Sequence, residues 1–307
     1  MELKVVEQAV AAASEKTCEG KVATYIPELG KADGSRVGVC VFSRSGERIS
    51  VGDTKTRFSI QSISKVISLA VALELCGFDM VFKNVGMEPS GDAFNSMVKL
   101  EYAHSVPYNP MINAGAIVIA SYLAPRISFD EMMKTSRSLC LDPDIVLDEN
   151  VYRSEMSNIS RNRAIAYLLE SKGYIEKDVE KCLHFYVKMC SLSVTAESLA
   201  GLGLVLANDG IHPATGERLL QEQTVRVVKT IMLTCGMYDG SGQFAVRVGI
   251  PSKSGVGGGI LSVIDREMGI GIYGPSLDDK GNSVAGRYIL EHLSEKWHLH
   301  LFDNRRG

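Results

Sequence analysis

Segments with the pattern of β-strands lie only near the two ends of this chain, and a long stretch of helical pattern separates them. Near the start, residues 37–43 and 48–51 are rich in β-branched side chains and flank a turn, which is typical of a hairpin. Near the end, residues 246–250, 258–264 and 269–273 have the same character. Neither group is large enough to form a stable sheet by itself. We therefore predict one antiparallel sheet of about five strands, assembled from both ends of the chain.

The middle of the chain has the apolar spacing of helices. Helices are predicted at residues 66–75, 114–123, 129–139, 161–169, 179–189, 196–206 and 223–233. Two further helices, one starting near Leu3 and one at residues 285–297, are expected to cover one face of the sheet, because a sheet must bury that face. The predicted fold class is α+β. Residues 1–61 together with 241–307 would form the sheet domain and residues 62–240 an inserted, mainly helical subdomain, with the active site between them.

Charge and hydropathy exclude several classes of protein. The 307 residues include 33 Lys and Arg against 36 Asp and Glu, a net charge of −3. Nucleic-acid binding and attachment to anionic membranes both need clustered positive charge, so neither partner is expected. The longest apolar run, residues 112–125, is too short to span a bilayer, and the start of the chain lacks the pattern of a signal peptide. A cytoplasmic location is therefore predicted.

Neither a cofactor nor a metal is expected. The segment from Gly269 to Gly274 fits G-x-G-x-x-G, but it lies inside a predicted strand, whereas the dinucleotide-binding form must open a helix. His298 and His300 lack the spacing of zinc ligands. The seven cysteines are an odd number and widely spaced, which favours free, buried thiols over a disulfide framework.

An S-x-x-K motif occurs twice, at Ser62/Lys65 and at Ser96/Lys99. Residues three apart share a helix face, so the lysine can reach the serine hydroxyl. It can act as a base only if burial or positive potential lowers its pKa. Ser62 lies between a strand-like segment and an apolar helix, whereas Ser96 lies in a polar stretch. Ser62 is therefore the candidate nucleophile, and an ordinary helix start is the alternative.

A second motif supports this interpretation. Lys253-Ser254-Gly255 precedes a glycine-rich stretch and a predicted strand. A K-[ST]-G triad accompanies S-x-x-K in serine β-lactamases and penicillin-binding proteins. The alternative is a glycine-rich bulge in a strand. Together the two motifs predict a serine acyl-transfer site, and the absence of an export signal favours a cytosolic amide as substrate.

The sequence also resembles the serine-dependent glutaminases, from about residue 20 to residue 301. The resemblance is carried by residues 20–27, 58–65, 88–91 with Phe94 and Asn95, 109–116, 154–155, 161–162, 185–186, 235–238 and 253–259. It implies a β-lactamase/penicillin-binding-protein-like fold and hydrolysis of L-glutamine to L-glutamate and ammonia. It also implies self-association as a homodimer or homotetramer.

By this resemblance Ser62 is the nucleophile, Lys65 is its base, and the backbone N–H groups of Ser62 and Val256 form the oxyanion hole. Tyrosines that match pocket-lining residues of the family are Tyr25, Tyr186 and Tyr238. One of them would protonate the leaving nitrogen, and Tyr186 is preferred. Glutamine carries an α-ammonium and an α-carboxylate, and a selective site must pair both. Matching residues for these groups and for the amide are Glu155, which suits the ammonium, and Asn113 and Asn162, which suit the carboxylate or the amide.

Two other functions use the same residues. A β-lactam- or D-amino-acid-directed hydrolase would share Ser62 and Lys65, but the sequence contains no S-D-N triad. A non-catalytic glutamine sensor would bind glutamine without turnover. Assays with glutamine and a β-lactam discriminate among the three.

Overall fold

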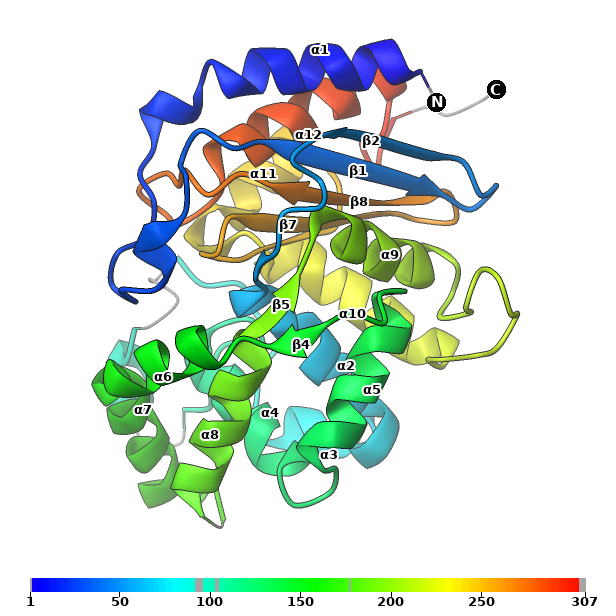
Figure 1. Ribbon diagram of the computed structural model, residues 1–307. Coiled ribbons are helices and arrows are strands. Elements are labelled where there is room, and N and C mark those ends of the chain that lie inside the picture. The colour runs from blue at the N-terminus through cyan, green and yellow to red at the C-terminus, as the bar shows by residue number, and fades with distance from the viewer. Residues whose placement is uncertain (1, 92–95, 103–104, 177, 304–307) are drawn as a thin grey trace.

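The computed structural model describes residues 2–91, 96–102, 105–176 and 178–303. A five-stranded antiparallel sheet has the strand order β2-β1-β8-β7-β6. Its strands are β1 (Gly38–Ser43), β2 (Arg48–Gly52), β6 (Ser252–Ser254), β7 (Gly259–Ile264) and β8 (Met268–Tyr273). The two ends of the chain meet where β1 pairs with β8, for example with Val41 opposite Ile270. One sheet assembled from both ends is therefore confirmed (Figure 1).

The prediction of a strand at residues 246–250 is wrong. Helix α11 (Ser241–Arg247) occupies the start of this segment, and the fifth strand is β6, which contains Lys253 and Ser254 of the K-S-G triad. The alternation of apolar residues in this segment fits a strand as well as it fits a helix. The pattern of buried side chains, however, is that of a helix. Phe244 and Val248, four residues apart, are buried, whereas Val246 is 80% exposed. Gly249, with φ +64°, then reverses the chain before β6.

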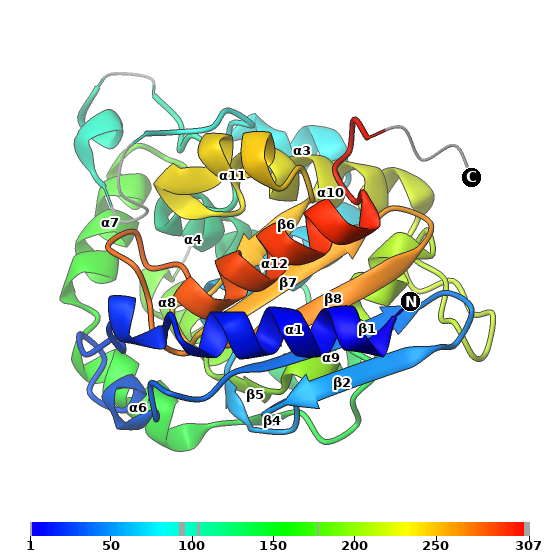
Figure 2. The same cartoon turned by 90° about the horizontal axis from the view of Figure 1, so that it is seen from above.

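The two terminal helices cover one face of the sheet, as predicted. Helices α1 (Leu3–Ser14) and α12 (Val284–Trp297) lie side by side over the sheet (Figures 1 and 2). Val6 and Ala9 of α1, together with Ile289 and Leu293 of α12, are buried in one apolar cluster with β1, β7 and β8. This cluster is the core of the sheet layer.

Helix α9 (Ala196–Ala207) covers the opposite face, although it belongs to the predicted helical range 62–240. Glycines on β8 allow its backbone to approach the sheet closely. A Cβ at Gly271 would lie 1.9 Å from the Ala196 carbonyl oxygen, and a Cβ at Gly269 would lie 2.2 Å from that of Ala200. The G-x-G-x-x-G match is therefore explained by packing.

The remaining helices lie mainly below the sheet in Figure 1. They are α2 (Ser64–Cys76), α3 (Phe78–Lys83), α4 (Asn113–Leu123), α5 (Phe129–Leu139), α6 (Glu149–Ser157), α7 (Ser160–Ser171), α8 (Val179–Cys190) and α10 (Glu222–Cys235). Short 3-10 turns are η1 (Thr17–Glu19), η2 (Leu29–Lys31), η3 (Gln61–Ile63), η4 (Val98–Glu101) and η5 (Tyr238–Gly240). Among the described residues, no helix has the length and apolar character needed to cross a bilayer.

A second, three-stranded sheet has the order β3-β5-β4. Its strands are β3 (Phe58–Ser59), β5 (Leu192–Val194) and β4 (Val146–Leu147). Apart from the strand-like segment that contains β3, the sequence did not predict this sheet, because strands of two or three residues carry no measurable periodicity.

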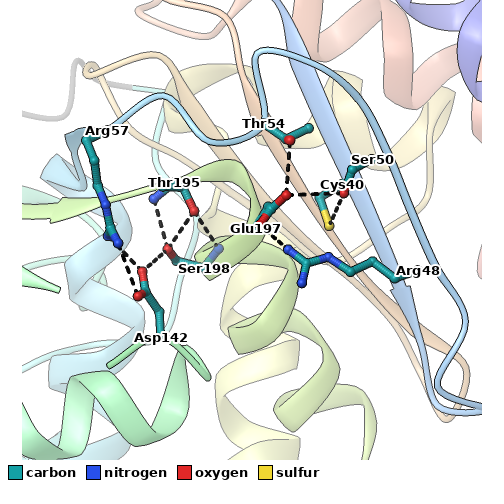
Figure 3. A network of polar contacts seen from close by, with 9 residues as sticks. All are labelled: Cys40, Arg48, Ser50, Thr54, Arg57, Asp142, Thr195, Glu197 and Ser198. Carbon is teal, nitrogen blue, oxygen red and sulfur yellow. Dashed lines mark hydrogen bonds and ion pairs between the residues drawn. The ribbon is translucent and has the colours of Figure 1, made fainter. Parts of the chain in front are cut away.

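A polar network fixes the start of β3 (Figure 3). Arg57 makes a two-pronged ion pair with Asp142, at 2.7 and 3.2 Å, and the hydroxyl of Ser198 donates to the same carboxylate at 2.5 Å. The neighbouring Glu197 of α9 pairs with Arg48 of β2. Bidentate, partly buried ion pairs of this kind give geometric precision. The network therefore joins α9, β2 and the strand that leads into Ser62.

Candidate active site

Ser62 lies in the 3-10 turn η3, between β3 and α2, and is buried. The preceding residue, Gln61, has φ +48°, which is the left-handed region that non-glycine residues rarely adopt. Two hydrogen bonds hold it there: its Nε2 donates to the Ser59 hydroxyl at 2.9 Å and to Glu155 Oε2 at 3.3 Å. A strained conformation fixed by buried contacts is common at functional sites.

Lys65 is the second residue of α2 and is buried, and burial can lower the pKa of an amine as a general base requires. Its Nζ donates to the carbonyl oxygen of Met111 at 3.2 Å and to Asn113 Oδ1 at 2.7 Å. Burial lowers the pKa of Lys65 to about 8, although the potentials of Cys190 and Glu155 oppose the shift. A neutral amine has two N–H donors, which match these two acceptors and leave its lone pair free to take a proton.

Lys253 of β6 is a second fully buried amine. Its Nζ donates to the carbonyl oxygens of Gly236 at 3.1 Å and Ser254 at 2.5 Å, and lies 4.4 Å from the centre of the Tyr238 ring. Burial, and then the charge of Lys65, hold the pKa of Lys253 well below its usual range. The K-S-G lysine therefore belongs to the same buried cluster as Lys65.

Tyr238 lies between the two motifs. It has φ +54° and is buried. Burial raises the pKa of Tyr238, while the nearby Ser62 side chain and Val256 backbone partly offset the rise. Tyr238 thus lies near both the candidate nucleophile and a predicted oxyanion donor. The structure brings Ser62, Val256 and Tyr238 together.

The other two predicted tyrosines differ in exposure. Tyr186 of α8 is 6% exposed, and burial raises its pKa well above the usual range. Cys190 and Glu155 raise this pKa further. Tyr25 lies at the rim of the site, and 55% of its surface is exposed, yet its hydroxyl end is surrounded by protein. This burial raises the pKa of Tyr25, and Tyr238 and Glu155 raise it further. All three predicted tyrosines therefore lie within electrostatic range of the candidate site.

Glu155 of α6 is buried, with 7% of its surface exposed. Burial raises its pKa to about 7, although the hydrogen bond from Gln61 and the charge of Lys65 act to lower it. A buried carboxylate gains strongly from a cationic partner, because an unpaired buried charge is costly. Nearby, Asn113 Nδ2 donates to Asn162 Oδ1 at 3.0 Å. Acidic and amide groups thus lie close to the Ser62–Lys65 pair.

Sequence reasoning missed two residues of this cluster. Gln61 gives no signal, because its left-handed backbone is imposed by tertiary contacts. Cys190 follows Tyr186 by one helical turn, a spacing that could have identified it. The Lys99 side chain of the second S-x-x-K motif, and Phe94 and Asn95, lie outside the described residues.

Within the described ranges, no group of three or more His, Cys, Asp or Glu side chains is arranged to hold a metal ion.

Comparisons with known proteins agree on one family. The sequence model of the family Glutaminase matches residues 20–302. A glutaminase of Clostridium botulinum is 51% identical over 288 residues, covering 92% of this chain and 94% of that protein. Glutaminase 2 of Clostridium perfringens is 49% identical over 287 residues, with the same coverage.

A solved structure extends the likeness to the fold. It is the covalent complex between a Bacillus subtilis glutaminase and 5-oxo-L-norleucine, formed by reaction of that protein with 6-diazo-5-oxo-L-norleucine. It has a TM-score of 0.88 at 38% identity and covers 97% of this chain and 98% of its own. The α+β, β-lactamase-like fold class predicted from the sequence is confirmed. This chain belongs to the glutaminase family.

Proposed function

We propose that this protein hydrolyses L-glutamine to L-glutamate and ammonia through a glutamyl ester on Ser62. Family membership across almost the whole chain supports the reaction. The observation that carries the mechanism is the buried Lys65, which lies three residues after Ser62. Its amine donates hydrogen bonds to the Met111 carbonyl oxygen and to Asn113 Oδ1. A lysine with a lowered pKa can activate a serine hydroxyl that is otherwise a weak nucleophile.

In the first half of the proposed reaction, neutral Lys65 takes the proton of Ser62, and Oγ attacks the side-chain amide carbon of glutamine. The backbone N–H groups of Ser62 and Val256 stabilise the oxyanion. The carbon–nitrogen bond then breaks as Tyr186 donates its proton to the nitrogen, which leaves as ammonia. Lys65 is then protonated, Tyr186 is ionised, and the glutamyl group is esterified to Ser62.

In the second half, water attacks the ester carbon. Ionised Tyr186 accepts the proton from water, and the carbon–oxygen bond to Ser62 breaks as Lys65 returns its proton to Oγ. Glutamate leaves and all three side chains are restored, so the cycle balances.

Recognition of glutamine follows from the polar groups around this pair. Glu155 would pair the α-ammonium, which supplies the cation that a buried carboxylate needs. The amides of Asn113 and Asn162 would bind the α-carboxylate or the reacting amide, and Tyr25 and Tyr238 would line the pocket. The similar Bacillus subtilis glutaminase supports a covalent route, since it forms a covalent complex after reaction with 6-diazo-5-oxo-L-norleucine.

The decisive experiment measures ammonia and glutamate release by wild type and by Ser62→Ala. We expect kcat to fall by about 1,000-fold or more, because the nucleophile is lost. Ser96→Ala, at the second S-x-x-K motif, is the matched control and should keep wild-type activity. Glutamine binding by calorimetry without turnover in wild type would instead favour a sensor, and labelling of Ser62 by a β-lactam without glutaminase activity would favour another acyl-hydrolase.

The resemblance also leads us to propose a homodimer or homotetramer and a cytoplasmic location. Light scattering coupled to size-exclusion chromatography tests the first, and cell fractionation tests the second. We also propose that the chain divides into two parts. One is a sheet domain of residues 1–61 with 241–307, and the other is a mainly helical part of residues 62–240.

A further inference from the structure

Tyr238 has an unusual backbone conformation for a residue of the candidate site. Its φ of +54° lies in the left-handed region, which non-glycine residues rarely adopt and which persists only where surrounding contacts impose it. Tyr238 is the first residue of the 3-10 turn η5, between α10 and α11. A 3-10 turn has right-handed backbone angles, so the turn itself does not explain this conformation. Other contacts must hold it.

The side chain of Ser241 supplies such contacts on both sides of Tyr238. Its hydroxyl oxygen accepts a hydrogen bond from the N–H group of Met237 at 3.0 Å, and the same hydroxyl donates to the carbonyl oxygen of Tyr238 at 2.8 Å. The Met237 carbonyl oxygen, on the peptide between them, accepts from the N–H group of Gly240 at 3.0 Å and from Asn282 Nδ2 at 3.4 Å. Ser241 is buried, which strengthens its two bonds.

The backbone conformation of Tyr238 decides where its ring lies. The ring packs in one apolar cluster with Val256, whose N–H group is a proposed oxyanion donor. A Cβ added at Gly281 would lie 3.4 Å from Val256 Cγ1 and 3.6 Å from Cε2 of Tyr238, so both side chains border the same point. The ring centre also lies 4.4 Å from the Nζ of Lys253. A right-handed backbone at Tyr238 would turn the Cα–Cβ bond and move the ring away from these neighbours.

We propose that Ser241 is a positioning residue that holds Tyr238 in its left-handed conformation and so keeps the phenol beside the oxyanion donor Val256. This inference rests on the proposed function, because it assigns a support to a residue that lines the pocket of that reaction. In the proposed function Val256 acts on the reacting carbonyl, whereas Glu155 pairs the α-ammonium. Loss of the Ser241 hydroxyl should therefore slow the chemical step more than it weakens substrate binding.

The first test compares Ser241→Ala and Ser241→Thr with wild type in glutamine hydrolysis. Alanine removes both hydrogen bonds, so kcat should fall by about 10- to 100-fold, as a small misplacement of an active-site group can cause, while KM changes by less than about twofold. Threonine keeps the hydroxyl and should restore most of kcat. Ser294→Ala is the matched control, because it removes a similarly buried hydroxyl that donates to the Val248 carbonyl oxygen at 2.7 Å in the sheet layer. Its kcat should equal that of wild type.

The second test separates positioning from a general loss of structure, and it does not depend on whether threonine fits the buried site. In a double-mutant cycle, Ser241→Ala should lower kcat little further in the Tyr238→Ala background, because no phenol remains to be placed. All variants are assayed below their thermal unfolding midpoints, so that loss of folded protein does not enter kcat. Additive effects on kcat in the cycle, or an equal fall of kcat in Ser241→Ala and Ser294→Ala, would overturn the proposal.

These outcomes are distinct from failure of the proposed function. If wild type releases no ammonia from glutamine, the reaction itself is wrong. If wild type is active and Ser62→Ala is not, but Ser241→Ala matches wild type in kcat, only the role of Ser241 is refuted.

Discussion

Lys65 and Glu155 are ionisable side chains that the fold buries near one another, and burial favours the neutral form of each. It lowers the pKa of the amine to about 8 and raises that of the carboxyl to about 7. Burial removes the hydration of the charged form, so it raises the pKa of acids and lowers the pKa of amines. Both groups therefore titrate in the range in which the enzyme would work, and this gives two predictions.

The value of kcat/KM should rise with pH and level off above a midpoint near 8, because only neutral Lys65 accepts the Ser62 proton. The measurement is kcat/KM for glutamine from pH 6 to pH 9.5. Circular dichroism over the same range controls for unfolding. A flat profile from mildly acidic to alkaline pH would exclude Lys65 as the titrating base.

Glu155→Gln should weaken glutamine binding and stabilise the fold. Loss of the charge partner for the α-ammonium should raise KM by about 10-fold or more. Since folding raises the carboxyl pKa from 4.5 to about 7, ionisation of Glu155 destabilises the native state increasingly through that window and fully above it. The variant should therefore be more stable than wild type by about 1–3 kcal/mol at pH 8, with a smaller difference at pH 5.5.

Thermal unfolding at the two pH values measures this difference, and Glu149→Gln, an exposed glutamate on the same helix, is the control. A variant of Glu155 with unchanged KM would show that another group binds the ammonium.

At the scale of elements, the contact between helix α9 and strand β8 depends on two particular glycines. Gly269 and Gly271 face the α9 backbone at distances that leave no room for a Cβ. The sequence predicted both elements but not their contact. Only the tertiary structure shows that the glycines of β8 make room for a helix from the middle of the chain.

Gly271→Ala should destabilise the protein by about 3 kcal/mol, because the new methyl group must push α9 away from the sheet. Gly242→Ala is the matched control: it lies in α11 with nothing within 4 Å, so alanine should be neutral or slightly stabilising. Denaturant unfolding measures both. Equal stability of Gly271→Ala and wild type would contradict the close approach of α9.

In the whole molecule, two apolar cores meet at the sheet. One lies between the sheet and the terminal helices, and the other fills the helical part and includes Leu261 and Val263 of β7. The sheet core is built from residues 6–49 and 237–299, whereas the helical core is built from residues 58–235 together with Leu261, Val263 and Tyr273 of the sheet. This arrangement couples the stability of the layers.

We therefore expect the two layers to unfold together. Trp297, the single tryptophan, packs against the sheet core, while far-ultraviolet circular dichroism reports mainly on the helices. The two signals should follow one denaturant transition, as cooperative unfolding requires. Separate midpoints would show that the sheet and helical layers are independent units.

The sequence by itself determined most of the element types, the single sheet shared by both chain ends, the two motifs that indicate a serine acyl-transfer site, and the family. These depend on local periodicity and on short patterns, which need no knowledge of distant contacts. Only the tertiary structure decided that residues 246–250 are not a strand, that α9 covers the sheet, and that Gln61 and Cys190 belong with Ser62. Each of these depends on burial or on backbone conformation imposed by residues far away in the chain. The same is true of the pKa shifts of Lys65 and Glu155, because a sequence does not show which charges lose their water.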